Sequence, residues 1–290
     1  MINSTRTFLL TFIAMTAFAG NSLLCRWALK DTFIDPATFT SVRIVTGALV
    51  LWIILRLRNI LHSGDHVVRG NWPSALALFT YAEAFSYAYI NLTTGTGAIL
   101  LFAAVQLIMI VYGLWRGEHF NIQQILGLFI ATAGVTWLLL PGASTPKLTD
   151  SLIMLIAGTA WAIYSLRGRI SADAMRVTTG NFMLATIFTL CLSLTFISKV
   201  KIDSMGVMLA VISGAITSGI GYVIWYAALQ RLNITNAAVV QLSVPIIAAI
   251  GGAFFLNDVI TLRLIEASVA TLSGIGLVIM GRVKLAERID

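Results

Sequence analysis

The chain has 290 residues, of which 58% are hydrophobic and 11% charged, and its mean hydropathy is +0.91. This composition excludes a soluble globular domain and indicates a protein whose solvent is the lipid bilayer. The formal net charge is +7, but Lys and Arg form no basic cluster along the chain, so nucleic acid is not an expected partner.

Apolar stretches occupy most of the chain. A helix of about 20 apolar residues crosses the hydrocarbon core of a membrane. The longest connection between such stretches, residues 57–72, is too short and too polar for a folded extramembrane domain. We therefore predict an all-α polytopic membrane protein with ten transmembrane helices, near residues 7–26, 37–56, 73–91, 96–115, 122–140, 150–167, 178–198, 205–229, 236–256 and 261–281.

The first stretch resembles a cleavable signal peptide, because Arg6 precedes an apolar run that ends in Ala17-Phe18-Ala19. However, residues 14–26 recur 143 positions later as residues 157–169, with seven of thirteen positions identical. Cleavage after Ala19 would remove half of this repeated segment. We therefore expect the first stretch to be retained as a transmembrane helix.

The same offset also pairs Phe39 with Phe182 and Thr46 with Thr189, so the repeat extends into the next stretch. This pattern predicts two halves, residues 1–146 and 147–290, with five helices each. Because five is odd, the second half enters the membrane from the opposite side and the repeat is inverted. In transporters, inverted repeats place a binding site near the midplane between the halves.

The distribution of Lys and Arg predicts the orientation. With the N-terminus inside, twelve of the 19 Lys and Arg lie in cytoplasmic segments, six lie on the opposite side, and Arg43 lies within a span. Positive residues favour the cytoplasmic side. We expect both termini to be cytoplasmic, with the positive segments facing the anionic lipid of the inner leaflet.

Charged residues inside spans are costly and are usually paired or functional. Glu83 lies near the middle of the third stretch, where it could bind a substrate ammonium, carry a coupling proton, or simply bond to a neighbouring helix. Arg43 and Glu266 share a depth in their stretches. We predict that these two form a structural ion pair, because each would otherwise be uncompensated.

Aromatic residues are concentrated on the third and eighth stretches, which correspond in the two halves and hold five of the seven Tyr. Aromatic walls suit apolar amino acid side chains and also stack on cations. Packing or interfacial belts are the alternative explanation. The aromatic candidates for a transport pathway are Tyr81, Tyr87, Trp161, Tyr164, Tyr222 and Trp225.

Uncharged polar residues within spans need a hydrogen-bond partner or a water-filled cavity. Pro245 frees a backbone carbonyl for such contacts, and Gly219 and Gly221 precede Tyr222 where a bend would move the aromatic face. We predict gating or hinge roles for these three residues, with ordinary helix packing as the alternative. The polar candidates for the pathway are Asn21, Gln106, Gln241 and Ser243.

An enzyme is not expected. The three histidines lie in predicted connections, so no Ser and His dyad can form within the membrane, and phosphate-binding and zinc-protease motifs are missing from the sequence. Cys25 and Cys191 fall in or beside apolar stretches, where small packing residues are more common than disulfides or metal ligands. We therefore predict no metal site and no cofactor.

The two predicted five-span halves are accompanied by two short motifs, Ser243-Val244-Pro245 and Gly117-Glu118-His119. In these features the whole chain resembles the EamA family of the drug/metabolite transporter superfamily. The chain departs from the family pattern at Gln106, where Pro is usual, and at Asn257-Asp258, where Glu is usual.

Within that family the chain is similar to bacterial inner-membrane exporters of aromatic amino acids. The resemblance implies a secondary transporter that exports amino acids by alternating access. A monomer would be sufficient for this activity, because one chain holds both halves. The alternatives are a carrier for organic cations or nucleotide derivatives and a passive facilitator. Arg43 is the one cation inside a span, which counts against nucleotides.

Overall fold

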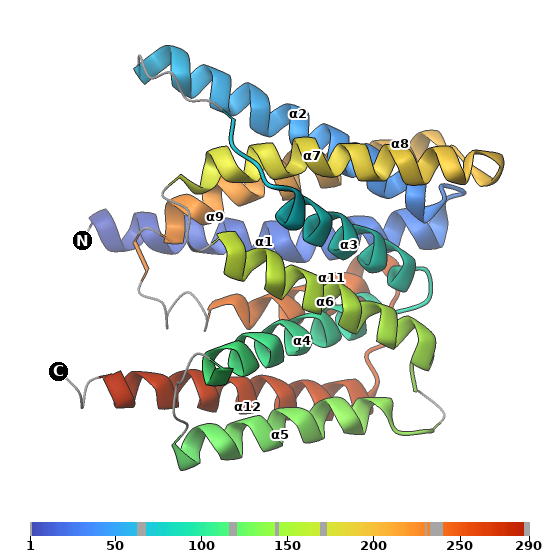
Figure 1. Ribbon diagram of the computed structural model, residues 1–290. Coiled ribbons are helices and arrows are strands. Elements are labelled where there is room, and N and C mark those ends of the chain that lie inside the picture. Colours follow the sequence, from blue (N-terminus) through green and yellow to red (C-terminus); the bar gives the residue numbers. More distant parts are fainter. Residues whose placement is uncertain are drawn as a thin grey trace.

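The computed structural model describes residues 2–62, 68–115, 121–142, 145–168, 173–229, 231–232 and 240–286 (Figure 1). Its regular elements within these ranges are all helical. In the first half of the chain they are α1 (Ile2–Asp31), α2 (Pro36–His62), α3 (Trp72–Tyr89), α4 (Thr94–Trp115) and α5 (Ile122–Leu139). In the second half they are α6 (Leu148–Gly168), α7 (Ala174–Thr195), η1 (Ile197–Lys199), α8 (Ser204–Ile212), η2 (Ser213–Ile220), α9 (Gly221–Leu229), α11 (Ser243–Leu256) and α12 (Leu262–Ala286).

Eight helical segments of the described chain are long and apolar enough to cross a membrane, with α8, η2 and α9 counted as one continuous segment. This confirms a polytopic all-α membrane protein. Two of the ten predicted spans are not among the eight. Polar residues dilute the apolar character of α3, and α11 has 14 residues, so it falls short of a full crossing. The predicted span 236–256 begins outside the described residues, which resume at residue 240.

Local sequence signals explain where several helices begin and end. The side chain of Asn71 caps α3 by accepting a hydrogen bond from the Ser74 N–H at 3.0 Å. Asn121 and Gln124 form a reciprocal capping box at the start of α5. After α11, Asn257 adopts a left-handed conformation with φ of 51°, a common way to end a helix.

The helices are arranged with α1 in the interior of the bundle. It packs against α3, α4, α9 and α11, while α2 and α7 pair at one edge and α5 and α12 pair at the other (Figure 1). The described chain begins and ends on the same side of the bundle (Figure 1). Segments from both halves therefore surround the centre of the molecule.

Small residues allow some helices to touch backbone to backbone. A Cβ atom on Gly127 of α5 would lie 2.6 Å from the carbonyl oxygen of Gly274 on α12, so this pair of helices requires glycine at the contact. The outer surface is apolar, with Phe129 and Phe254 exposed by 73% and 82%. This surface suits contact with lipid chains.

The eighth predicted span differs from a regular α-helix. Residues Ser213–Ile220 form a π-helix between α8 and α9, in a segment that includes Gly214 and Gly219. π-Helical turns are rare, and they occur often at functional sites because they widen the helix and redirect the side chains that follow. The side chain that follows here belongs to Tyr222.

Candidate functional site

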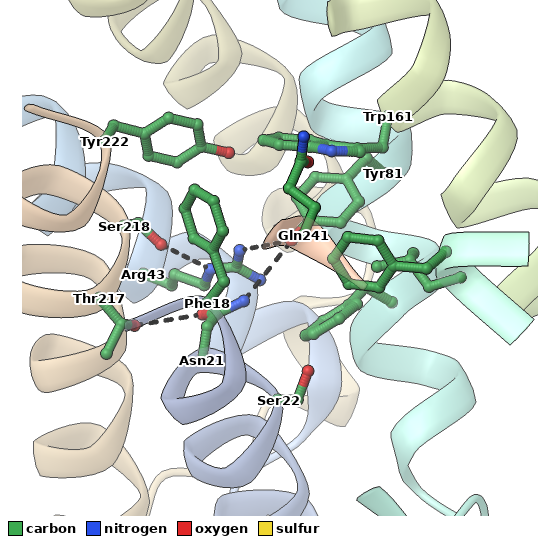
Figure 2. A pocket seen from close by; sticks show the side chains of 13 residues that line it. Phe18, Asn21, Ser22, Arg43, Tyr81, Trp161, Thr217, Ser218, Tyr222 and Gln241 are labelled. Carbon is green, nitrogen blue, oxygen red and sulfur yellow. Dashed lines mark hydrogen bonds between the residues drawn. The ribbon is translucent and has the colours of Figure 1, made fainter. Parts of the chain in front are cut away.

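A small cavity lies at the centre of the bundle, where side chains from both halves converge (Figure 2). Its volume is ≈ 30 Å³, which is enough for one or two water molecules and far less than the roughly 300–1,000 Å³ of a typical ligand pocket. The lining comes from α1, α2, α3, α4, α6, η2, α9 and Gln241, which lies two residues before α11. The lining residues are Phe18, Asn21, Ser22, Arg43, Tyr81, Phe85, Leu101, Phe102, Trp161, Thr217, Ser218, Tyr222 and Gln241.

Aromatic rings form much of the cavity wall. The ring of Trp161 lies 4.7 Å from that of Tyr81 and 5.5 Å from that of Tyr222, measured between centroids. Phe18 on α1 meets Tyr222 and Trp225 edge to face, each at 5.9 Å. The sequence-predicted aromatic cluster is therefore assembled from α3, α6 and α9, and Phe18 adds a fourth helix to it.

Asn21 connects α1 to the π-helix. Its amide oxygen accepts hydrogen bonds from the hydroxyls of Ser213 at 2.7 Å and Thr217 at 3.4 Å, and its amide nitrogen donates to the Tyr81 hydroxyl at 3.5 Å. The Asn side chain thus joins the first half to the irregular segment of the second half. A change in the π-helix would alter these bonds directly.

Arg43 is the charged group of the cavity and is only 2% exposed. Its Nε donates to the Ser218 hydroxyl at 3.3 Å and its Nη2 donates to the Tyr81 hydroxyl at 3.1 Å (Figure 2). The guanidinium carbon also lies 5.2 Å from the centre of the Phe85 ring. The remaining nitrogen, Nη1, is buried and has no hydrogen-bond partner among the described residues.

The predicted ion pair between Arg43 and Glu266 is wrong. Glu266 lies on α12 and accepts a hydrogen bond from the Trp137 indole of α5 at 3.0 Å, whereas Arg43 points to the centre of the bundle. Depth along the membrane normal does not fix which helices face each other. In this fold α12 packs on α5 and α4, and α2 packs on α7, η2, α8 and α3.

Glu83 lies outside the cavity lining. It is 7% exposed, and both carboxylate oxygens lack a hydrogen-bond partner in the part of the chain that the structure describes. On α3 it shares a face with Phe79, which contacts Phe188 of α7, and with the half-exposed Tyr87. Glu83 and Tyr87 are therefore separated from the cavity cluster, and the bond to a neighbouring helix that was one expectation for Glu83 is not formed.

The remaining sequence-predicted residues lie around the cavity or beyond it. Tyr164 and Trp225 are buried behind the lining, in contact with Trp161 and Phe18 respectively. Gln106 is buried on α4 but does not line the cavity. The Ser243 hydroxyl donates to the Val240 carbonyl at 2.6 Å, while Gln241 lines the cavity.

The three predicted hinge residues stand where the helices change character. Gly219 is in the π-helix, Gly221 is the first residue of α9, and Pro245 is the third residue of α11. A proline in the first helical turn interrupts no bond within the helix. Motion at these positions stays a prediction. The Gly117-Glu118-His119 segment lies outside the described residues.

A cluster of charged groups lies near the end of α1, beyond the cavity-lining residues Asn21 and Ser22 of the same helix. The Asp258 carboxylate accepts hydrogen bonds from the Thr94 N–H at 2.8 Å and the Thr94 hydroxyl at 2.7 Å, and so caps α4. Arg26 Nε and Lys30 Nζ of α1 lie 4.0 and 3.8 Å from the same carboxylate. Arg26 also donates to the Tyr89 carbonyl at 2.9 Å. This closure cluster joins α1, α3 and α4 to the loop between α11 and α12.

Sequence reasoning missed several lining residues, namely Phe18, Ser22, Phe85, Leu101, Phe102, Thr217 and Ser218. Phe18 had a usable signal, because its counterpart in the repeat is Trp161, another lining residue. Arg43 also had one, as a cation inside a span. The apolar lining of α4 had none, because its residues are typical of lipid-facing positions as well.

Comparison with known proteins gives relatives along the whole chain. An uncharacterized protein of Pseudomonas aeruginosa is 48% identical over 283 residues, which cover 98% of each chain. An uncharacterized transporter of Archaeoglobus fulgidus is 27% identical and covers 88% of this chain and 91% of its own. A solved structure with 16% identity shares the fold, with a TM-score of 0.65 over 94% of this chain and 97% of the other.

The family comparison agrees with these relatives. The model of the EamA-like transporter family matches the chain twice, at residues 5–140 and 149–280. Together the two matches cover nearly all of the apolar helices described above, and they include every residue that lines the central cavity. The chain is thus a multi-pass membrane protein that belongs to the EamA-like transporter family.

Proposed function

We propose that this protein is a secondary transporter that exports amino acids with aromatic or other apolar side chains across the bacterial inner membrane by alternating access. The observation that carries the proposal is the central cavity, whose aromatic wall combines Tyr81 of the first half with Trp161 and Tyr222 of the second. Rings of this kind bind an apolar side chain by contact area and offset stacking. A site shared by both halves changes its accessibility when the halves move.

The packing between helices supports the two inverted halves, residues 1–146 and 147–290. Contacts between them come in matched sets: α3 packs on α6 as α8 and α9 pack on α1, and α4 packs on α6 as α11 packs on α1. Some further contacts join counterparts directly, α2 with α7, α4 with α11 and α5 with α12. A pseudo-twofold axis in the membrane plane produces this pattern, with ten spans when α3 and α11 are included.

The small size of the cavity is consistent with a transporter conformation in which the central site is closed. A phenylalanine side chain does not fit into ≈ 30 Å³, so the walls have to separate before cargo enters. The π-helix is suited to such a change, since eight residues with i to i+5 bonding can return to α-helical bonding and rotate Tyr222. In the proposed orientation, with both termini cytoplasmic, the closure cluster around Asp258 seals the outer side.

The character of the lining argues against the alternative cargoes. No lining side chain is acidic, since Glu83 lies on another face of α3. A lining without a carboxylate disfavours organic cations as cargo. A nucleotide with two or more phosphate charges would meet one guanidinium, that of Arg43. An apolar amino acid needs neither an acidic site nor several cations.

Counterflow of radiolabelled phenylalanine in proteoliposomes tests the proposal. Proteoliposomes loaded with unlabelled phenylalanine are expected to accumulate the radiolabelled form transiently and saturably. Trp161→Ala is expected to reduce this exchange at least tenfold, because the aromatic wall is lost. Trp115→Ala is the matched control, since that side chain is 79% exposed and far from the lining. Lack of exchange for every apolar amino acid, with protein that is folded and inserted, contradicts the assignment of cargo.

A further inference from the structure

The guanidinium of Arg43 is a buried cation that forms no ion pair with a carboxylate of the described residues. It is 2% exposed, and two of its nitrogens donate hydrogen bonds to the neutral hydroxyls of Ser218 and Tyr81. Hydroxyls solvate a cation but do not neutralise it. A buried charge without a counter-charge is strongly unfavourable, so the site favours an anionic group that enters from the cavity.

The third nitrogen offers the place for such a group. Nη1 is buried and unpartnered within the described residues, and Arg43 belongs to the lining of a cavity that has aromatic rings on its other sides. A guanidinium edge binds the two oxygens of a carboxylate in a planar, bidentate arrangement. The aromatic wall of Tyr81, Trp161 and Tyr222 lies where the apolar body of the same molecule would extend (Figure 2).

The lining offers less to a substrate ammonium. Its uncharged polar groups are hydroxyls and the amides of Asn21 and Gln241, and the Asn21 oxygen already accepts two hydrogen bonds. Among the nearby carboxyls, Glu83 lies on a different face of α3 and outside the lining. The cavity therefore distinguishes the two charged ends of an amino acid, with strong recognition for the carboxylate and weak recognition for the ammonium.

We propose that Arg43 binds the carboxylate of the cargo through its free edge, and that the protein accepts apolar monocarboxylates whether or not they carry an ammonium group. This inference rests on the proposed function in that it uses the same cavity, but it makes the carboxylate the required group. Aryl carboxylates without an amine belong to the substrate class. Amines and amides of the same size do not.

Binding to the purified protein in detergent tests the inference without any need for transport. Thermal unfolding is measured with 3-phenylpropanoate, phenylalanine, 2-phenylethylamine and acetate at equal concentrations. The first two are expected to raise the midpoint with saturation, and the amine is expected to bind at least tenfold more weakly because it lacks the carboxylate. Acetate at the same concentration is expected to give no shift, since it has no apolar body. An equal shift with acetate would indicate an adventitious anion and overturn the proposal.

Variants then assign the effect to Arg43. Arg43→Gln is expected to weaken binding of 3-phenylpropanoate at least tenfold, with partial recovery in Arg43→Lys. Arg56→Gln is the matched control, because Arg56 is exposed on the same helix and packs over Trp52. Affinity for 3-phenylpropanoate within twofold of wild type in Arg43→Gln overturns the proposal. If Arg43→Gln does not fold, the four ligands on the wild-type chain still decide the question.

Amino acid transport and carboxylate binding by Arg43 can be rejected independently of each other. Equal binding of 2-phenylethylamine and 3-phenylpropanoate, together with normal phenylalanine counterflow, rejects carboxylate anchoring and leaves the amino acid transporter intact. Arg43-dependent binding of 3-phenylpropanoate without phenylalanine counterflow supports the anchor and rejects amino acid export. Glu83→Gln in the same binding assay is expected to leave the affinity for 3-phenylpropanoate within twofold of wild type, because Glu83 lies outside the cavity lining. A tenfold gain there would show that the Glu83 carboxylate repels the bound anion, and would contradict an anion site at Arg43 that is separate from Glu83.

Discussion

Replacing Asp258 by Asn is expected to open the end of the protein that the closure cluster seals. The carboxylate accepts two hydrogen bonds from Thr94, at 2.8 and 2.7 Å, and lies within 4.0 Å of Arg26 Nε and 3.8 Å of Lys30 Nζ. Asparagine preserves the shape and can still cap α4, but it removes the charge. Arg26 and Lys30 then face each other without compensation.

The size of the effect follows from these contacts. Changing two charge-assisted hydrogen bonds into neutral ones halves their strength, which costs about 1–2 kcal/mol in total. A pair of unit charges at 4 Å attracts by about 4 kcal/mol at an effective dielectric constant of 20, but desolvation offsets most of this. Lys30 is also 32% exposed and screened by solvent. We estimate that the closed form loses about 2–3 kcal/mol of stability relative to the open form, which raises the open population about 30- to 150-fold.

The rate of thiol modification reports the open population. A cysteine at Ser22, which lines the cavity, is introduced into a chain that carries Cys25→Ala and Cys191→Ala. Under conditions in which opening is faster than labelling, the rate in detergent is proportional to the open fraction. Asp258→Asn is expected to raise this rate by the factor given above.

Asp203→Asn provides the matched control for this prediction. Asp203 also caps a helix, because it accepts a hydrogen bond from the Gly206 N–H at 2.8 Å, but it has no ion pair among the described residues. Its substitution is expected to change the labelling rate by less than threefold. A rate in Asp258→Asn that stays within threefold of the parent, or an equal increase in both variants, would refute the role of the cluster as a closure.

Three further predictions concern the interior. Gly214→Ala places a methyl group against the backbone of α2 and is expected to lower the unfolding midpoint by several degrees and to abolish phenylalanine exchange. In the same thermal melt and counterflow assay, Gly276→Ala is expected to change neither quantity, because nothing lies within 4 Å of the added methyl group. Glu83→Gln is expected to preserve counterflow but to abolish accumulation driven by a pH gradient, because a buried carboxyl with two unpartnered oxygens is a candidate proton carrier; unchanged gradient-driven uptake contradicts this role. Asn21→Leu leaves the buried Ser213 hydroxyl without its acceptor and is expected to cost about 1–3 kcal/mol of unfolding free energy, while an unchanged denaturation curve would show that this bond contributes little.

The fold was accessible from the sequence because bilayer thickness and helix rise together fix the length of a span. The repeat of residues 14–26 at 157–169 further indicated two related halves, and the family match covers both regions. The π-helix was only indirectly visible. Gly219 and Gly221 suggested a bend, but an i to i+5 pattern depends on contacts with α1 and α2 that no local sequence signal encodes.

The candidate site was predicted in part. Asn21, Tyr81, Trp161, Tyr222 and Gln241 line the cavity, because deep aromatic and polar residues have few other uses in a membrane helix. The rotation of each helix about its axis decided the remaining assignments.

Arg43 shows this limit most clearly. It is buried within a helix, as an intramembrane cation should be, but its partner depended on which helices are neighbours, and α12 lies on the opposite edge of the bundle from α7 (Figure 1). Asp258 was noticed only as a departure from the family pattern at Asn257-Asp258. Its role in the closure cluster required knowledge that Arg26 and Lys30 of α1 end beside it.

The measurement that tests the central claim most directly is the accessibility of the cavity from each side of the membrane. A membrane-impermeant thiol reagent is applied to the Ser22→Cys chain, without its native cysteines, in right-side-out and in inside-out vesicles. Alternating access predicts modification from both sides, with bound phenylalanine slowing each reaction. Modification from one side alone, at every phenylalanine concentration, would contradict a single central site that opens in turn to the two faces of the membrane.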